Sequence, residues 1–543
     1  MNRIKFFLSV LLLIFLSGSF CLHAQIAPVT ATSGNGDSLR RIEILDHTRE
    51  LTIQTVDDTT RLTIISGNVQ LRQGNTLFFC DSCVMNNNTN TFEAWGNVHI
   101  NDADTINIYS NHLRYLSKQR LAYLDGNVRL TDGKGTLTTP DLEYNMETNI
   151  GIYTHGGKVV NKKSVLTSSE GVYYADLRDI YFKNNVVLKD PGYDIVTDSL
   201  LYNTETQTTR FIAQTTIKDS SGRIIKTKEG FINQQTGQAQ FGQRPEIIDG
   251  DITVRSNTMF FNDSTGISIA EGNAVINNVK EKTTIIAGKV TRNKNDESFL
   301  ATNKPLMILQ QENDSIYVSA DTLYMARLSD KFGNKDSVIV DSVKGTKEPK
   351  YKESDSTNRY FEAYRNVRVF NDSMQAVCDS MFYSFRDSVF RLYDEPVVWS
   401  QKSQITGDTI LLFTKNKKAD KVEAFENSFM VNELEPGVYN QIKSSRMDGW
   451  FLDGSLDSVR AMGFAECIYF LRDEDSAYSG INQSKCDVID MYFKDKELNK
   501  VVFREEVTGT IWPIKQKGPA EMRLENFQWL EERRPKTKFE MFE

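Results

Sequence analysis

Short segments in which apolar and polar residues alternate recur along most of the chain. Residues 67–71, 96–100 and 126–130 read Gly-Asn-Val-Gln-Leu, Gly-Asn-Val-His-Ile and Gly-Asn-Val-Arg-Leu. A period of two places every second side chain on one face of a β-strand. Gly-Asn just before each strand suits a tight turn, because both residues tolerate positive φ. The pattern therefore predicts strands with one buried face.

These segments are spaced by roughly 30 residues, which is typical of stacked repeats. Less regular copies occupy residues 157–159, 185–188, 214–217, 243–247, 272–276, 365–369 and 394–398. Between them lie segments in which a polar corner precedes an apolar and often an aromatic residue, at 81–83, 111–115, 198–202, 321–324 and 379–383. Each unit therefore contributes two short strands. Units this short bury an apolar face only by stacking, so we expect an elongated all-β fold, a β-solenoid or a related stack.

The repeat pattern divides the chain. We expect a signal peptide at 1–24, an N-terminal linker at 25–48, a first β-array at 49–325 and a second array at 359–515. Residues 326–358 are rich in Ser, Asp and Lys and interrupt the pattern, which indicates an insertion or linker. In the C-terminal tail, 516–543, Met522, Phe527 and Leu530 share one possible helical face, which predicts a helix or tail that caps the array.

The chain begins like an exported protein. Arg3 and Lys5 precede an apolar run at residues 6–16 and small residues that end at Ala24. The run is shorter than the roughly 20 residues that a membrane-spanning helix needs. We expect cleavage after Ala24. Lipid attachment at Cys21 is the less favoured alternative, since Phe20 is bulky for the residue before such a cysteine.

Composition narrows the classes of function. The net charge of -8 argues against a nucleic-acid partner, which requires a concentrated basic face. The histidines His47, His99, His112 and His155 are scattered without metal-ligand spacing, so we expect no metal site. No nucleophile elbow, P-loop or zinc-protease motif is present, so no catalytic residue and no cofactor are predicted.

Two recurring residue types have a chemical interpretation and a structural one. Aspartates at the corners could serve a β-helix enzyme, but they recur in many units whereas an active site is built once, which favours turn formation. They are Asp81, Asp198, Asp321, Asp379, Asp408 and Asp487. Cys80 and Cys83 form a C-x-x-C in a β-like segment, not at a helix start, so a redox role is disfavoured. Pairing of Cys467 with Cys486 stays open.

The apolar column of the repeat is the candidate functional feature. Closed by opposing side chains, it is ordinary core; left open, it is a groove able to hold acyl chains. The residues expected to line this interior are Val69, Leu71, Val98, Ile100, Val128, Leu130, Val186, Leu188, Val275, Val367 and Val369.

The repeated Gly-Asn-Val-x-Leu/Ile strand, the intervening Asp-Ser-Leu-x-Tyr strand and the signal peptide together resemble the OstA-like (organic solvent tolerance-like) family, which includes the periplasmic lipopolysaccharide-transport protein LptA. The resemblance is best over residues 66–277 and continues more weakly over 361–503. It implies an open β-jellyroll whose hydrophobic trough holds the lipid A part of lipopolysaccharide. It also implies jellyroll partners at the inner and outer membranes, joined by edge-strand addition, with head-to-tail self-association as a further option.

Three functions from different classes follow. The first is a periplasmic bridge or accessory that carries lipid toward the outer membrane. Association of the chain with that membrane is a further option. The second is a structural scaffold of the cell envelope with a sealed core. The third, less favoured, is a β-helix enzyme that degrades polysaccharide. An open apolar groove supports the first, a sealed core the second, and one cleft of converging carboxylates and basic residues the third.

Overall fold

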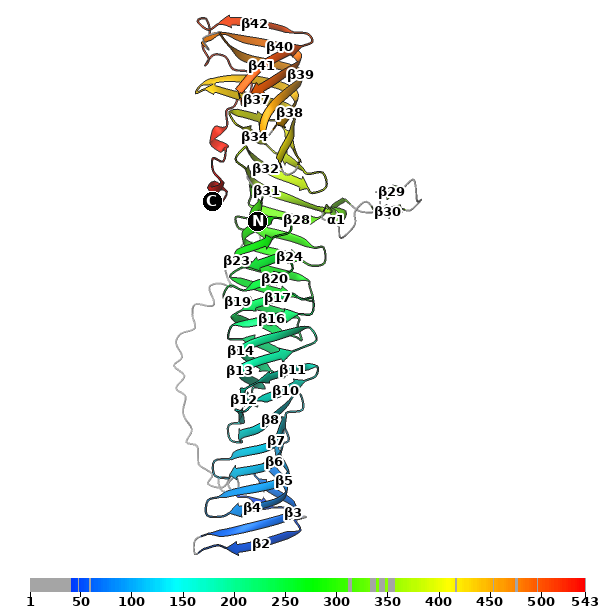
Figure 1. Cartoon of the computed structure of the whole chain (residues 1–543), viewed down its shortest axis with the longest axis vertical. Helices are drawn as coiled ribbons and strands as arrows, with labels where there is room; N and C mark the ends of the chain where they lie inside the picture. The colour runs from blue at the N-terminus through cyan, green and yellow to red at the C-terminus, as the bar shows by residue number, and fades with distance from the viewer. Residues whose placement is uncertain are drawn as a thin grey trace, which may run out of the picture.

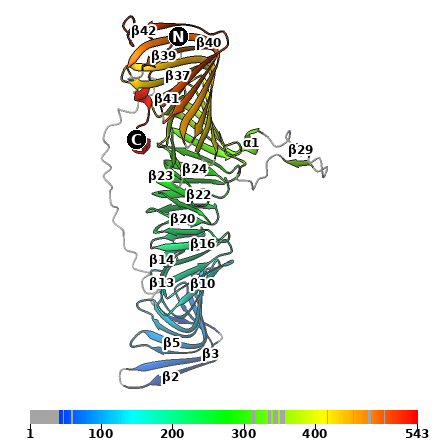
Figure 2. The ribbon, with the colours of Figure 1, turned by 45° about the horizontal axis from the view of Figure 1, so that its top comes forward.

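The computed structural model describes residues 41–543 except 47, 58–59, 311–314, 333–337, 341–346, 350–356, 416–417, 453, 474–476, 496 and 543. The signal peptide and most of the N-terminal linker therefore lie outside the described residues. The described chain forms one 40-stranded sheet and a separate two-stranded sheet. It makes a long, narrow shaft (Figures 1 and 2). The expected elongated all-β fold is confirmed.

The shaft is a stack of antiparallel rungs. Each rung bends near its middle, and it is either one continuous strand or two shorter strands that meet at the bend. Some rungs are continuous: β3 Arg61–Gln73, β4 Thr76–Asn86, β5 Thr91–Asp102, β6 Ile106–Leu116, β7 Leu121–Thr131, β8 Thr136–Asn145, β13 Asp179–Lys189, β14 Tyr193–Asn203, β23 Ile267–Asn278, β24 Thr283–Asn293, β31 Arg359–Phe370, β32 Met374–Ser384, β37 Lys418–Glu435, β38 Val438–Leu452, β39 Ser455–Arg472 and β40 Tyr478–Lys494.

Other rungs are broken at the bend into two shorter strands. These pairs are β1 Glu43–Ile44 and β2 Glu50–Thr55, β9 Ile150–Tyr153 and β10 Gly157–Asn161, β11 Ser164–Ser168 and β12 Glu170–Tyr174, β15 Thr208–Phe211 and β16 Thr215–Asp219, β17 Ile224–Thr227 and β18 Glu229–Asn233, β19 Gln238–Gly242 and β20 Glu246–Asp249, β21 Ile252–Arg255 and β22 Thr258–Asn262, β25 Ser298–Thr302 and β26 Leu306–Leu309, β27 Ile316–Ser319 and β28 Thr322–Arg327, β33 Val389–Tyr393 and β34 Val397–Ser400, β35 Ser403–Thr406 and β36 Thr409–Lys415, and β41 Glu497–Arg504 and β42 Thr508–Pro513.

The bend itself is a β-bulge built from the Gly-Asn pair. Between β3 and β4, Gly67 and Asn68 oppose the single residue Asp81, so the register shifts by one. Both residues of the pair have positive φ, 78° and 52°. An extra residue on one strand bends it sharply. Gly-Asn therefore lies inside a continuous strand, and its expected place in a turn before the strand is corrected.

Each rung runs from one edge of the shaft, through the bend, to the other edge. We call edge A the row of hairpins at 87–90, 117–120, 146–149, 175–178, 204–207, 234–237, 263–266 and 294–297. Edge B is the row at 74–75, 103–105, 132–135, 162–163, 190–192, 220–223, 250–251 and 279–282. The two halves of the rungs enclose an interior trough, and the line along which edges A and B face each other is its mouth.

The two predicted arrays form one sheet. β28 pairs with β31 from Thr322↔Tyr364 to Arg327↔Arg359, so the ladder passes directly from one array to the other. The charged segment is thus an excursion at edge A and not a linker that separates two stacks. It contains helix α1 (Leu328–Phe332) and the hairpin of β29 (Val338–Val340) and β30 (Lys347–Pro349), which projects sideways from the shaft (Figure 1).

Of the two expected forms of the C-terminal segment, helix or tail, the described residues form a tail. It contains only two short 3₁₀ turns, Glu531–Arg533 and Lys538–Phe542, and runs back along the outside of the shaft (Figure 1). Met522 and Leu524 are buried in an outer apolar cluster with Phe429 and Ile468. No helix in the described part of the chain is long and apolar enough to cross a membrane.

Two buried glutamines hold the tail. Gln441 Nε2 donates to the Met522 carbonyl at 3.0 Å, and its Oε1 accepts from the Leu524 N–H at 2.9 Å. Gln404 repeats the arrangement with the carbonyl of Gln528 and the N–H of Leu530, at 3.0 and 2.7 Å. Each amide therefore pairs with the tail backbone as a neighbouring strand would, and satisfies polar groups that burial would otherwise leave without a partner.

Candidate functional site: the apolar trough and its mouth

The trough is lined by one continuous apolar cluster that extends from Ile65 to Met491. Ten of the eleven residues predicted to face the interior are in this cluster and are nearly inaccessible to solvent. They are Val69, Leu71, Val98, Ile100, Val128, Leu130, Val186, Leu188, Val367 and Val369. The alternation of the sequence therefore placed these side chains correctly, because each copy keeps the same offset from the bulge.

Val275 is the exception. Its neighbours Ala274 and Ile276 belong to the interior cluster, whereas Val275 does not. Gly272 and Asn273 both have positive φ, and the register shifts between Glu271 and Ala274, so the interior face resumes at Ala274. The prediction of Val275 as an interior residue is wrong by one position, because this copy reads Gly-Asn-Ala-Val where the others read Gly-Asn-Val-x.

Between β3 and β16 the trough is filled by its own side chains, many of them aromatic. The rings of Phe78 and Phe92 meet edge to face with centroids 5.3 Å apart, and Tyr115 contacts both. Buried rings of this kind contribute roughly 1.5–3 kcal/mol each from removal of apolar surface from water. This section is sealed in the structure.

A row of tyrosines approaches edge A with a spacing of 29 residues. It consists of Tyr115, Tyr144, Tyr173 and Tyr202. Their hydroxyl groups reach across the mouth to polar residues of edge B: Tyr115 donates to Gln73, Tyr144 to Asp102 at 3.4 Å, and Tyr173 to Asp132 at 3.1 Å, while Tyr202 accepts from Asn161 at 3.2 Å. Opposite ends of the rungs are therefore tied together. We call this set of contacts the polar seam.

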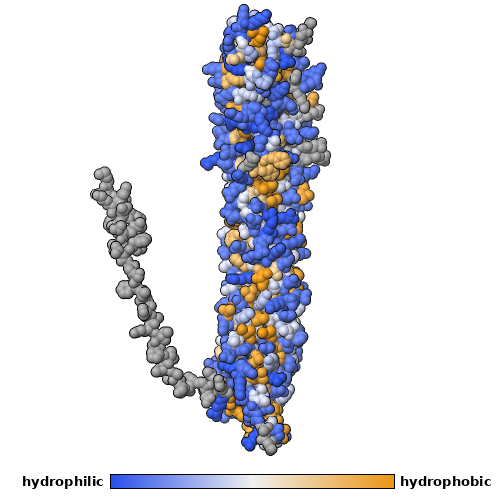
Figure 3. Space-filling view, turned by 90° about the vertical axis from the view of Figure 1, so that its left-hand side faces the viewer, coloured by the Kyte–Doolittle hydropathy of each residue, from blue (hydrophilic) through white to orange (hydrophobic). Residues whose placement is uncertain are grey.

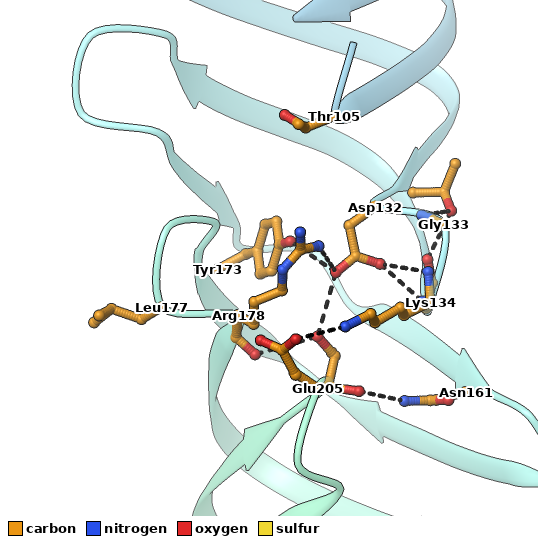
Figure 4. Close-up of polar contacts among 12 residues, drawn as sticks. Thr105, Asp132, Gly133, Lys134, Asn161, Tyr173, Leu177, Arg178 and Glu205 are labelled. Carbon is orange, nitrogen blue, oxygen red and sulfur yellow. Dashed lines mark hydrogen bonds and ion pairs between the residues drawn. The ribbon is translucent and has the colours of Figure 1, made fainter. Parts of the chain in front are cut away.

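Asp132 is the most heavily bonded member of the seam (Figure 4). Its carboxylate accepts from the backbone N–H groups of Lys134 and Gly135 on edge B, at 3.0 and 2.8 Å. From edge A it accepts from the guanidinium of Arg178 at 3.2 Å and from Tyr173 and the Thr204 hydroxyl. Hydrogen bonds donated to a carboxylate stabilise its charged form, so these contacts offset the cost of burying the Asp132 charge.

The electrostatics follow from these contacts. Burial raises the pKa of Asp132, but the hydrogen bonds from Gly135, Lys134, Arg178 and Tyr173 outweigh it and hold the pKa below the ordinary value. Burial raises the pKa of Tyr202 to about 12. At neutral pH the seam therefore combines an ionised aspartate with neutral hydroxyl donors.

The seam ends near β18. Its last contacts are made by Gln234, whose side-chain nitrogen donates to Asp190 at 2.9 Å and to the Tyr193 hydroxyl at 2.8 Å. Over the described residues 238–310, no hydrogen bond or ion pair joins edge A to edge B. The seam thus closes, or latches, the mouth as far as β18, and the mouth is unlatched over the described residues 238–310.

The corner aspartates have a structural role in the described geometry. Asp81, Asp321 and Asp408 each accept a hydrogen bond from the bulge asparagine of the next rung, Asn97, Asn366 and Asn427, at 2.9 to 3.2 Å. This pairing fixes the asparagine in its left-handed conformation. The preference for turn formation over catalysis agrees with these contacts.

One cavity at the corner combines acidic and basic residues, as an enzyme would require. It has a volume of about 810 Å³ and includes Asp379, Asp394, Glu395, Asp408 and Arg533. Two of its carboxylates have structural contacts: Asp394 accepts from the Ser380 hydroxyl at 3.0 Å, and Asp408 is bonded to the bulge asparagine.

Cysteines and histidines are also accounted for by packing. All five cysteines of the described chain are buried and free, Cys467 and Cys486 included. The hydrogen bond with Cys83, followed by burial, raises the pKa of Cys80, the opposite of a reactive thiolate. His99 stacks on Tyr109 with centroids 4.4 Å apart. His47 lies outside the described residues, within which no group of three metal-ligating side chains gathers.

Sequence reasoning missed the seam. The 29-residue spacing of Tyr115, Tyr144, Tyr173 and Tyr202 is visible in the sequence, as is the spacing of Asp102, Asp132, Asn161 and Asp190. The sequence does not show that the tyrosines pair with these polar residues. The pairing has an offset of about 41 residues, which depends on where each rung bends.

Comparisons with known proteins agree with this architecture. Residues 41–198 match the family model of OstA-like proteins, and residues 253–418 match the model described as LptA/(LptD N-terminal domain) LPS transport protein. No curated protein matches the chain. Among solved structures, the chain is similar to LptH, the LptA homologous periplasmic component of the lipopolysaccharide transport device of Pseudomonas aeruginosa. The sequence identity is 11%, the TM-score is 0.19, and the match covers 26% of this chain and 82% of that one.

A stack of bent antiparallel rungs around an apolar trough defines the class of elongated β-jellyroll proteins. Within that class, the chain is similar to OstA-like proteins over residues 41–198 and to the LptA/(LptD N-terminal domain) family over residues 253–418. The second of these models describes lipopolysaccharide transport proteins.

Proposed function

We propose that this chain is a non-enzymatic, periplasmic lipopolysaccharide-binding bridge or accessory protein. It carries the acyl chains of lipid A in its trough toward the outer membrane. The observation that supports this most directly is the continuity of the interior cluster from Ile65 to Met491. An acyl chain that enters this cluster exchanges water for apolar surroundings, as a lipid carrier requires.

Both ends of the shaft suit strand addition by partner jellyrolls. At one end β2 pairs with β3 alone among the described strands, and its residues Leu51 and Ile53 are 48% and 66% exposed. At the other end β42 pairs only with β40, and Ile511 is 65% exposed. Each end strand leaves a row of backbone groups able to pair with another chain. Matching jellyrolls of the inner- and outer-membrane machinery, or a second copy of this chain, are the partners we propose.

A purified-protein experiment tests lipid carriage. The mature chain is mixed with fluorescent lipid A or with O-polysaccharide that lacks lipid A, and binding is measured by gel filtration. Lipid A should co-elute with the protein, and the polysaccharide should not. Failure of lipid A to bind a folded protein would overturn the proposal.

A pair of neighbouring substitutions locates the binding. Ala274 points into the trough and Val275 does not. Ala274→Leu adds volume inside the trough and should weaken lipid A binding, whereas Val275→Leu should leave it unchanged. Thermal unfolding of both variants separates blockage from overpacking, which costs about 1–3 kcal/mol when a core does not adjust.

A scaffold is the second candidate, and the sealed section favours it. Between β3 and β16 the interior residues are almost fully buried against one another, as in an ordinary core. A scaffold would bind neither lipid A nor polysaccharide, and Ala274→Leu would change stability alone. The same gel-filtration series therefore distinguishes the two functions.

A further inference from the structure

The trough changes character where the polar seam ends. Between β17 and β31 many interior apolar side chains are only partly buried although they pack on the same cluster, namely Ile232, Ala239, Val254, Phe261, Ile276, Ile285, Phe299 and Met325. From β3 to β16 the partly buried side chains on this cluster are fewer: Met85, Ala175 and Tyr193. Apolar surface therefore meets solvent in the unlatched section. Figure 3 shows one face of the shaft, with patches of apolar residues between hydrophilic ones.

At β18 and β22 the sequence of edge A also lacks the tyrosines that form the seam. Tyr144 and Tyr202 each precede the asparagine that ends the strand, Asn145 or Asn203. In β18 and β22 the residue before the terminal asparagine is Ile232 or Phe261, neither of which has a hydroxyl group.

The hairpins confirm that these positions correspond. Asn145 Oδ1 accepts from the N–H groups two and three residues on, at 2.9 and 3.0 Å, and Asn233 Oδ1 does the same at 3.0 Å for both. The edge A turn is thus unchanged, and only the side chain that would cross the mouth differs.

Edge B loses its half of the latch in parallel. Asp219 occupies the position of Asp132 and Asn161 in the repeat, but its carboxylate binds Arg223 at 2.8 Å within its own hairpin. Asn278 likewise accepts from the Glu281 N–H at 3.0 Å. Across the mouth, the Arg223 guanidinium lies 6.0 Å from the Phe261 ring centre, which is a contact that can slide without loss of a hydrogen bond.

We propose that the section of the mouth from β19 to β26 is the lateral portal through which acyl chains enter and leave the trough. The section from β3 to β16 stays latched. The portal proposal rests on the proposed lipid-carrying function and names the section of the trough where lipid enters. Opening the portal breaks no polar contact between the edges, and the inserted chain covers side chains that are otherwise partly exposed to water. Opening the latched section would strand Asp132 and its donors without partners.

Site-specific photo-crosslinking in cells tests the portal. A photoreactive amino acid is placed at Ile276 or Ile285 in the portal and at Val98 or Leu188 in the latched section. Val275 serves as the matched control, because it adjoins Ile276 but lies outside the interior cluster. Adducts are detected with an antibody against lipopolysaccharide, and thermal unfolding of each purified variant shows that it is folded.

We expect a several-fold higher adduct yield at the two portal positions than at the latched positions and the control. Equal yields at portal and latched positions would overturn the portal while leaving lipid carriage intact. An absence of adducts at every position in folded protein would overturn both.

A second variant tests the latch without a bulky probe in the core. The triple substitution Y144F/Y173F/Y202F removes three hydroxyl groups and keeps the rings. With a photoreactive residue at Val128, this variant should yield lipopolysaccharide adducts that the otherwise unchanged protein lacks. An unchanged yield at Val128 would show that the seam does not control access.

Discussion

Tyr173 and Asp132 are 41 residues apart in the chain and share a hydrogen bond of 3.1 Å across the mouth of the trough. They belong to opposite ends of different rungs, so the bond ties together two strand ends that are not paired with each other in the sheet. The Asp132 side chain is only 3% exposed, and Arg178 and Thr204 share its carboxylate. The relationship makes Asp132 the centre of a clasp across the trough.

Asp132→Ala should loosen this part of the shaft locally. The change leaves the Arg178 guanidinium and the Tyr173 hydroxyl without their partner, which typically costs about 1–3 kcal/mol for a buried group. Amide hydrogen exchange should accelerate in β7, β8 and β12 and stay unchanged in β37 to β40. Glu147→Gln, an exposed change on edge A, is the control and should alter nothing. Uniform exchange rates in all variants would contradict the clasp.

Acidification should weaken the same clasp. The pKa of Asp132 is lower in the folded protein than its ordinary value of 3.8, so the unfolded chain takes up the proton first as the pH falls. Its contribution is complete above about pH 4 and is lost as the pH falls through the folded pKa. Urea midpoints measured from about pH 5 to pH 2.5 should fall less for Asp132→Asn than for the unaltered protein. Parallel pH curves would contradict this.

The tail should detach when its glutamine contacts are removed. Gln441→Ala leaves the Met522 carbonyl and the Leu524 N–H without partners, at a cost of about 1–3 kcal/mol. Limited proteolysis should then release fragments cleaved between residues 514 and 530. Gln240→Ala, an exposed glutamine far from the tail, is the control. Equal resistance of both variants to the protease would show that apolar packing alone holds the tail.

The bulge should tolerate no side chain at Gly96. This residue has φ of 75°, and a Cβ placed on it would collide with the carboxylate of Asp81. Gly133 has φ of 82° and open space around it, so Gly133→Ala carries the conformational strain without the collision. Gly133→Ala should cost about 1 kcal/mol and Gly96→Ala clearly more, as judged from thermal unfolding. Equal losses would mean that the corner yields easily.

The cysteines should not react while the protein is folded. Burial raises the pKa of Cys378 to about 12, and all five described cysteines are buried. A thiol reagent at about pH 8 should label none of them until denaturant is added, because the thiolate is the reactive form. Rapid labelling of Cys80 or Cys83 in native protein would revive a redox role for the C-x-x-C segment.

Much of the architecture was predictable because the repeat is local. Period-two alternation placed Val98 and Ile100 inside, since a strand presents alternate side chains to opposite faces whatever its partners are. The same reasoning failed at Val275, where one copy shifted its apolar residues by one position relative to the bulge. The helical alternative also failed for the tail, where the spacing of Met522, Phe527 and Leu530 suits a helix but the segment is irregular and packs on the outer apolar cluster.

The sequence by itself determined that this protein is a stack of β-repeats with an apolar interior, because alternation, bulge residues and hairpin asparagines act over a few residues. Tertiary structure alone decided where the trough is latched. That outcome depends on whether a tyrosine at edge A of one rung meets a polar residue at edge B of a different rung, about 41 residues away in the chain. The distance between those ends is set by the bends and by the stacking of every rung between them, which no local pattern encodes.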